Sequence, residues 1–127
     1  METKQVILIR RDLKMRRGKE IAQGAHAAMM WLKEHYLAFL NNEVGWNPSG
    51  AELDWLDGSM AKVVCQVADL AELEAVVAAA RAAHLTAHTV TDEGRTEFGG
   101  VQTVTAAAIG PGPADEVDAV CGKLRLY

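Results

Sequence analysis

The chain has 127 residues, of which 50% are hydrophobic and 24% charged, with a formal net charge of −4. These values are typical of one globular domain with a hydrophobic core, and we expect a single domain over residues 1–127. No stretch reaches the ~18 apolar residues of a membrane-spanning helix. The start of the chain lacks the order of a signal peptide, so we expect a cytoplasmic protein.

Positive charge is concentrated near the start of the chain. Residues 1–20 hold seven Lys or Arg and three Asp or Glu, a net charge of +4, whereas residues 21–127 hold six and fourteen, a net charge of −8. This asymmetry indicates a local anionic partner, although a short basic cluster is also compatible with an ordinary solvated surface. The cluster consists of Arg10, Arg11, Lys14, Arg16, Arg17 and Lys19.

The first half of the chain predicts a buried strand and a long helix. Residues 5–10 (QVILIR) form a compact apolar run with β-branched residues, which is typical of a buried strand. After Gly18, apolar residues recur at helical spacing to about Leu40, and Asn41 and Asn42 would end the helix. The residues expected to face the core are Ile21, Ala25, Ala28, Met29 and Leu32.

Further along, strands and helices alternate. Residues 44–50 (VGWNPSG) indicate a loop, and residues 51–58 (AELDWLDG) a short helix that returns Trp55 and Leu56 to the body. The remaining predictions are a buried strand over 61–68, a helix over 70–83 with Asp69 as its N-cap, a strand over 85–92, an irregular segment over 93–100, a strand over 101–110, a turn over 110–113, and a helix over 114–122 with Gly122 as its stop.

This order of elements predicts a small α/β sandwich. The crossover connections favour parallel pairing of the first three strands, and the short link after the third favours an antiparallel fourth, so the sheet would be mixed. In open α/β sheets the working site lies beyond the carboxyl ends of the strands. Residues 11–19 and residues 92–100 leave such ends, and both segments are rich in reactive side chains.

Lys19, Gln23 and His26 fall on one stripe of the predicted helix. This stripe lies roughly opposite the expected core face, so we expect it to face a cleft. Lys19 also lies in the first turn, where free backbone N–H groups and the helix dipole favour anions, rather than in the last turn, which suits a lysine. Binding an anion would explain its position; a solvent-facing polar stripe is the alternative.

The segment over 91–97 (TDEGRTE) contains a second group of reactive side chains. Asp92 could orient a base or a cation, Arg95 can bind a phosphate or a carboxylate, and Thr96 can donate or accept a hydrogen bond. Gln102 adds one amide nearby. The alternative is a solvated loop built around a turn.

No pattern in the sequence indicates a cofactor. Cys65 and Cys121 lie among apolar neighbours, which is typical of small buried side chains rather than of metal ligands or a disulfide. The four histidines have no acid or thiol partner at ligand spacing, and no phosphate-binding glycine loop or serine nucleophile motif is present. We therefore expect neither a metal nor a cofactor.

Several motifs occur together in this sequence: RRDLKM (10–15), RRGK-x3-Q-x2-HA (16–27), DEGRT (92–96), QTV (102–104) and IGPGPADEVDAVCGKLRLY (109–127). The combination resembles the archaeal-type peptidyl-tRNA hydrolases. The resemblance is strong over residues 5–31 and 87–127. It is weak over residues 33–60, a stretch that is also longer than is typical of the family. The resemblance implies a three-layer α/β/α sandwich with a four-stranded mixed sheet. It also implies metal-independent hydrolysis of the ester that joins a peptide to the terminal ribose of tRNA.

The resemblance implies a site in which Lys19, Gln23 and His26 meet Asp92, Arg95 and Thr96. As a hypothesis, Asp92 and Thr96 would hold the attacking water, and Lys19 would stabilise the developing negative charge or fix Asp92. Gln23 and His26 would position polar groups or exchange water. The resemblance also allows a homodimer. The residues expected to contact the tRNA are Arg10, Arg11, Lys14, Arg16, Arg17, Arg95 and Gln102.

Two departures from the family motif keep other functions open. Glu93 and Glu97 stand where the motif has Ala and Gln, and a carboxylate at position 97 repels phosphate; we expect it to pair with Arg95 or Lys19 instead. With such a site, the chain could be a non-catalytic module that binds nucleic acid or protein. A small-molecule esterase or amidase is a third alternative, which would not need the basic cluster.

Overall fold

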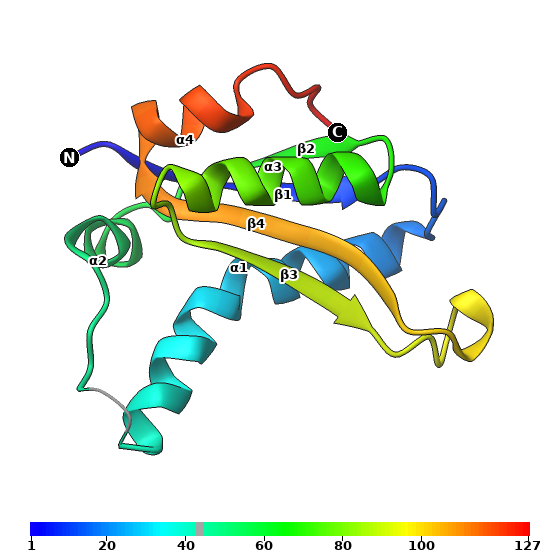
Figure 1. Cartoon of the computed structure of the whole chain (residues 1–127), viewed down its shortest axis with the longest axis horizontal. Coiled ribbons are helices and arrows are strands. Elements are labelled where there is room, and N and C mark those ends of the chain that lie inside the picture. Colours follow the sequence, from blue (N-terminus) through cyan, green and yellow to red (C-terminus); the bar gives the residue numbers. More distant parts are fainter. Residues whose placement is uncertain (43–44) are drawn as a thin grey trace.

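Four strands form one mixed sheet in the order β2-β1-β4-β3 (Figure 1). The computed structural model describes residues 1–42 and 45–127. Strands β1 and β2 are parallel, and β4 runs antiparallel to both β1 and β3. The strands are β1 (Thr3–Arg10), β2 (Lys62–Val67), β3 (Ala87–Asp92) and β4 (Thr103–Pro113). The predicted mixed sheet is confirmed.

The central position of β4 corrects the predicted pairing. Strand β3 runs in the same direction as β1 and β2, but it is hydrogen-bonded only to β4, which lies between β1 and β3. Residues 105–112 of β4 are all buried. A strand buried on both faces needs neighbours on both sides, which explains why β4 takes an inner place.

The predicted turn over 110–113 is wrong. These residues continue β4, because Gly112 pairs with Lys4 and Pro113 pairs with Thr3 of β1. Helix α4 (Ala114–Cys121) begins directly after the strand. The predicted loop over 44–50 begins at Val44, which lies outside the described residues.

Helices cover both faces of the sheet (Figure 1). Helices α1 (Arg17–Leu40) and α2 (Gly50–Asp57) lie on one face, and α3 (Leu70–Ala82) and α4 lie on the other. Alternate residues of β1 enter the two cores: Val6 and Leu8 pack toward α3 and α4, and Ile7 and Ile9 pack toward α1. The three-layer α/β/α sandwich is confirmed.

Several local predictions are also confirmed. Helix α1 ends at Leu40 with Asn41 as its C-cap, and the Asp69 side chain accepts a hydrogen bond from the Glu72 N–H at 2.9 Å. Cys65 and Cys121 are buried and unpaired, and burial raises the pKa of the Cys121 thiol to about 12. Within the described ranges, no helix is long and apolar enough to cross a membrane.

The buried stripe of α1 differs from the predicted one. Ile21 and Met29 are 67% and 62% exposed, whereas Gln23, Ala27 and Trp31 are buried. Apolar residues occur around most of this helix, so their spacing does not select one face. Small Ala27 lets the helix approach the sheet, and the Trp31 ring fills the space beside α2, 6.0 Å from the Trp55 ring centroid.

The observed stripe predicts unequal effects of two substitutions on α1. Trp31→Ala should lower the free energy of unfolding by about 3–5 kcal/mol, because it leaves a cavity between α1 and α2. Met29→Ala, two residues away on the exposed side, should change it by less than about 1 kcal/mol. Urea unfolding of both variants measures the difference; equal losses would contradict the assignment of the buried face.

Candidate active site

The sheet brings the two predicted segments to one edge. Because β1 and β3 are both antiparallel to β4, their carboxyl ends lie at the same end of the sheet. Residues 11–16 lead from β1 into α1, and residues 93–102 lead from β3 back into β4. In Figure 1 the start of α1 and the yellow β3–β4 connection lie at this same end.

Lys19, Gln23 and Asp92 form the polar centre of this edge. Lys19 Nζ donates to Asp92 Oδ1 at 2.7 Å, and Gln23 Nε2 donates to the same oxygen at 3.1 Å. Lys19 Nζ also donates to Thr96 Oγ1 at 3.0 Å. The Lys19 and Asp92 side chains are only 18% and 15% exposed, so water screens this ion pair less than it would a surface pair.

A tight turn holds the second oxygen of Asp92. The Gly94 N–H donates to Asp92 Oδ2 at 2.8 Å, and Gly94 has a φ of 81°. A Cβ atom at this position would lie 2.4 Å from the Val101 carbonyl oxygen, so the close approach requires glycine. The sequence analysis missed this amide, although an Asp two residues before a Gly is a known signal for such a turn.

These contacts determine the charge of Asp92. Its pKa lies below the ordinary value of 3.8, chiefly because Lys19 donates a hydrogen bond to the carboxylate. The Gly94 N–H, the positive charge of Lys19 and the Gln23 amide lower the pKa further, against the opposing effect of burial. Asp92 is therefore ionised at neutral pH.

The position of Gln23 corrects one expectation. Gln23 was expected on a stripe opposite the core face, but it is 2% exposed and lies on the buried stripe with Ala27 and Trp31. Lys19, Gln23 and Ala27 follow one another at intervals of four residues, so they lie on one face of the helix. This face is polar at the start of α1 and becomes part of the hydrophobic core at Ala27. His26 is exposed and lies beside the stripe.

The predicted reactive side chains line one open hollow. Its volume is about 350 Å³, and it lies between the start of α1 and the end of β3. A hollow of this size can admit a small reacting group together with water. Its lining includes Lys19, Gln23, His26, Asp92, Arg95 and Thr96.

The basic cluster divides into engaged and accessible residues. Arg10 binds both carboxylate oxygens of Asp12 and donates to the Val104 carbonyl at 2.9 Å, and its side chain is 11% exposed. Arg11 donates to Gln66 Oε1 at 2.6 Å. Neither arginine lines the hollow. The exposed residues of the cluster are Arg11, Lys14, Arg16 and Arg17.

The two departing glutamates neutralise arginines at the rim. Glu97 was expected to pair with Arg95 or Lys19, but it accepts a hydrogen bond from Arg16 Nε at 3.0 Å. Arg95 pairs with Glu93 at 3.1 Å. Lys19 already contacts Asp92 and Thr96, which leaves Arg16 as the cation near Glu97. Gln102 is exposed and does not line the hollow.

No group of three or more His, Cys, Asp or Glu side chains within residues 1–42 and 45–127 is placed to hold a metal ion.

The lowered pKa of Asp92 predicts a pH dependence of stability. A carboxylate with a depressed pKa stabilises the folded state above its ordinary pKa, and this contribution is lost as the pH falls through the lowered value. Asp92→Asn should therefore lower the free energy of unfolding at neutral pH, and its difference from wild type should shrink below about pH 4. Urea unfolding across this range tests the prediction; a difference independent of pH would contradict it.

Comparisons with known proteins identify the family of this chain. The sequence model described as "Peptidyl-tRNA hydrolase PTH2" matches residues 3–127. A protein of Aeropyrum pernix named peptidyl-tRNA hydrolase is 41% identical over 124 residues, which cover 98% of this chain and 95% of the relative. Human "Peptidyl-tRNA hydrolase 2, mitochondrial" is 39% identical over 127 residues, 99% of this chain and 65% of the relative. A Methanocaldococcus jannaschii peptidyl-tRNA hydrolase is 36% identical over 123 residues, 97% of this chain and 98% of the relative. The chain therefore belongs to the PTH2 family of peptidyl-tRNA hydrolases.

Proposed function

We propose that this chain hydrolyses the ester between the peptide and the terminal ribose of peptidyl-tRNA, and that Lys19, Asp92 and Thr96 carry the reaction. The observation that supports this most directly is the contact of Lys19 with both Asp92 and Thr96 in an open hollow beside exposed arginines. The family, and the names of its members, supply the substrate class.

Ester hydrolysis adds water to the carbonyl carbon, breaks the bond to the ribose oxygen and returns a proton to that oxygen. The ionised Asp92 carboxylate accepts the proton of the attacking water. Its lowered pKa keeps the carboxylate in the ionised form that can accept a proton, and it then passes this proton to the leaving ribose oxygen. No covalent intermediate is needed, since water itself attacks the ester.

Lys19 and Thr96 contact the carbonyl oxygen and the attacking water, respectively. The ammonium of Lys19 stabilises the negative charge that develops on the carbonyl oxygen. Since Lys19 donates to Thr96 Oγ1, the Thr96 hydroxyl hydrogen points elsewhere and can hold the water. Gln23 fixes Asp92 from beneath, and exposed His26 contacts the substrate or exchanges water at the rim.

The exposed basic residues at the start of α1 bind tRNA phosphates. Lys14, Arg16 and Arg17 are accessible there, and Arg95 lies across the hollow. Arg10 is left out of this surface, because Asp12 and the Val104 carbonyl already engage its guanidinium and its side chain is only 11% exposed. Arg11 is exposed and stays a predicted contact. The expected cytoplasmic location and the homodimer stay predictions.

Two substitutions test the reacting groups. Lys19→Ala and Asp92→Asn should each lower peptidyl-tRNA turnover by about 10²–10⁴-fold, the usual loss when a positioned acid–base group is removed. Glu74→Gln, an exposed position on α3 at the opposite face of the sheet, serves as the control and should stay close to wild type. The assay follows release of labelled peptide, with circular dichroism to show that each variant is folded.

The outcomes separate the classes of function. Normal hydrolysis by both site variants would refute the assigned roles. Binding of peptidyl-tRNA by wild type without release of peptide would favour the non-catalytic module.

The tRNA surface makes a separate prediction about salt. Replacing Arg16 and Arg17 together by Ala should weaken tRNA binding and reduce the slope of log K against log[salt] by about 1–2, because fewer counterions are released. Glu97→Gln should act in the opposite direction, since it frees the Arg16 guanidinium. Binding titrations over a range of salt concentrations measure both effects; an unchanged slope would exclude this surface from the interface.

A further inference from the structure

A second hollow adjoins the candidate active site. It has a volume of about 690 Å³ and lies between α1 and the edge strand β3. It shares His26, Val90 and Thr91 with the site hollow, so the two are continuous. The rest of its lining is mainly apolar and includes Met29, Met30, Leu32, Tyr36 and Trp46. We call this hollow the apolar groove.

The far wall of the apolar groove is held by a network of packed and buried side chains. The Trp46 ring lies 6.3 Å from the His35 ring, which packs at 6.0 Å against buried Trp31. His35 Nε2 lies 3.2 Å from Glu52 Oε1, and Glu52 is 3% exposed.

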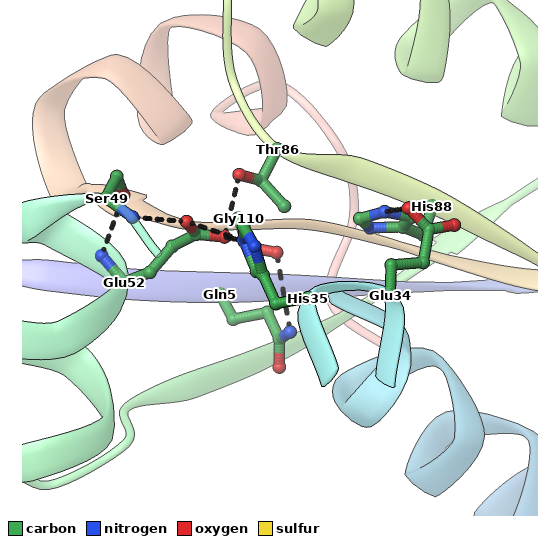
Figure 2. Close-up of polar contacts among 8 residues, drawn as sticks. All are labelled: Gln5, Glu34, His35, Ser49, Glu52, Thr86, His88 and Gly110. Carbon is green, nitrogen blue, oxygen red and sulfur yellow. Dashed lines mark hydrogen bonds and ion pairs between the residues drawn. The ribbon is translucent and has the colours of Figure 1, made fainter. Parts of the chain in front are cut away.

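Two further contacts fix that carboxylate. Glu52 accepts hydrogen bonds from the Ser49 N–H at 2.8 Å and from Thr86 Oγ1 at 3.1 Å. Figure 2 shows Glu52 between Ser49, His35 and Thr86. The aromatic wall is therefore positioned before any ligand arrives, which lowers the entropic cost of binding.

The order of features along α1 indicates which part of the substrate would lie toward the groove. Exposed Arg16 and Arg17 lie at the start of the helix, Lys19 and Gln23 form the site in the next turns, and the groove follows over residues 26–36. If the ester is cleaved at Lys19 and Asp92, as proposed above, the tRNA lies toward the arginines. The peptide must then leave the site on the other side, where the groove begins.

The chemistry of the groove fits such an occupant. Met29, Tyr36 and Trp46 are 62%, 53% and 47% exposed, an unusual amount of large apolar surface beside a polar site. Methionine side chains adapt to ligands of different shape, which suits a substrate with variable side chains. Another apolar hollow, of about 380 Å³ around Ile21 and Tyr127, shares no lining residue with the site.

We propose that the apolar groove binds the peptide part of peptidyl-tRNA and favours peptides with apolar side chains next to the residue that carries the ester. This inference rests on the proposed function. It assigns Trp46 and Tyr36 as specificity-determining residues, neither of which the sequence analysis singled out.

Binding is tested first without turnover. Trp31 and Trp55 are 2% and 4% exposed, so Trp46 is the tryptophan whose surroundings change when the groove is filled. An N-acetylated, C-terminally amidated Leu-Leu-Phe peptide should shift tryptophan emission to shorter wavelength in wild type but not in Trp46→Phe. A Gly-Gly-Phe peptide should give no shift. The absence of a shift with Leu-Leu-Phe, or the same shift in Trp46→Phe, would overturn the proposal.

Turnover then tests the specificity. One tRNA carries Phe on its ribose, preceded by Leu-Leu or by Gly-Gly. Wild type should have about a 10-fold higher kcat/KM for the Leu-Leu substrate, mainly through KM, because the groove buries leucine side chains that the Gly-Gly substrate lacks. Trp46→Ala should remove most of this preference.

Phe39→Ala is the matched control. Phe39 lies on the same helix and is 48% exposed, but it does not line the groove, so this variant should keep the preference of wild type. Equal kcat/KM values for both substrates in wild type, or an equal loss for both in Trp46→Ala, would overturn the groove assignment. No turnover of either substrate by wild type would instead overturn the proposed function, while the emission measurement still decides on the groove.

Discussion

The ion pair between Lys19 and Asp92 is the interaction on which the site depends. It joins the first turn of α1 to the end of β3, through two residues that lie 73 positions apart in the sequence. The pair can form because β4 lies between β1 and β3 and so directs both of their carboxyl ends to one edge. It is partly enclosed, and Gln23 and the Gly94 amide donate further hydrogen bonds to the carboxylate. The ion pair thus links α1 to β3 and also holds the polar side chains of the site in place before a substrate binds.

Acidic and basic residues are distributed unevenly over this protein. The acidic excess is carried by residues 21–127, whereas the accessible arginines gather where α1 begins. Glu97 and Glu93 reduce the positive charge at the rim of the hollow, since each forms an ion pair with one arginine. Exposed pairs of this kind are weak and compete with solvent, so a phosphate can displace the carboxylate from its arginine. In the proposed function, tRNA phosphates replace these glutamates as partners of the two arginines.

Much of the architecture could be predicted from the sequence. Compact apolar runs mark the four strands, the Asn41–Asn42 pair marks the end of α1, and Asp69 marks the start of α3. The motifs around Lys19 and Asp92 led to the family that the comparisons confirm. The place of β4 could not be predicted, because local patterns do not encode which strand lies between two others.

Three details of the site also depended on tertiary structure. The buried face of α1 was assigned wrongly, since apolar side chains surround the helix and only packing against β1 and α2 selects Ala27 and Trp31. The partner of Glu97 depends on where Arg16 lies in space. The apolar groove requires Trp46 to come beside α1 through contacts with His35, and no spacing in the sequence indicates that contact.

Gln23 belongs to two environments at once. Its stem lies in the layer between α1 and the sheet, and its amide holds the Asp92 carboxylate. The site is therefore continuous with the hydrophobic interior. A smaller side chain beneath the helix would shift the Gln23 amide and, with it, the hydrogen bond to the carboxylate. The packing of this layer and the geometry of the carboxylate are thus coupled through one side chain.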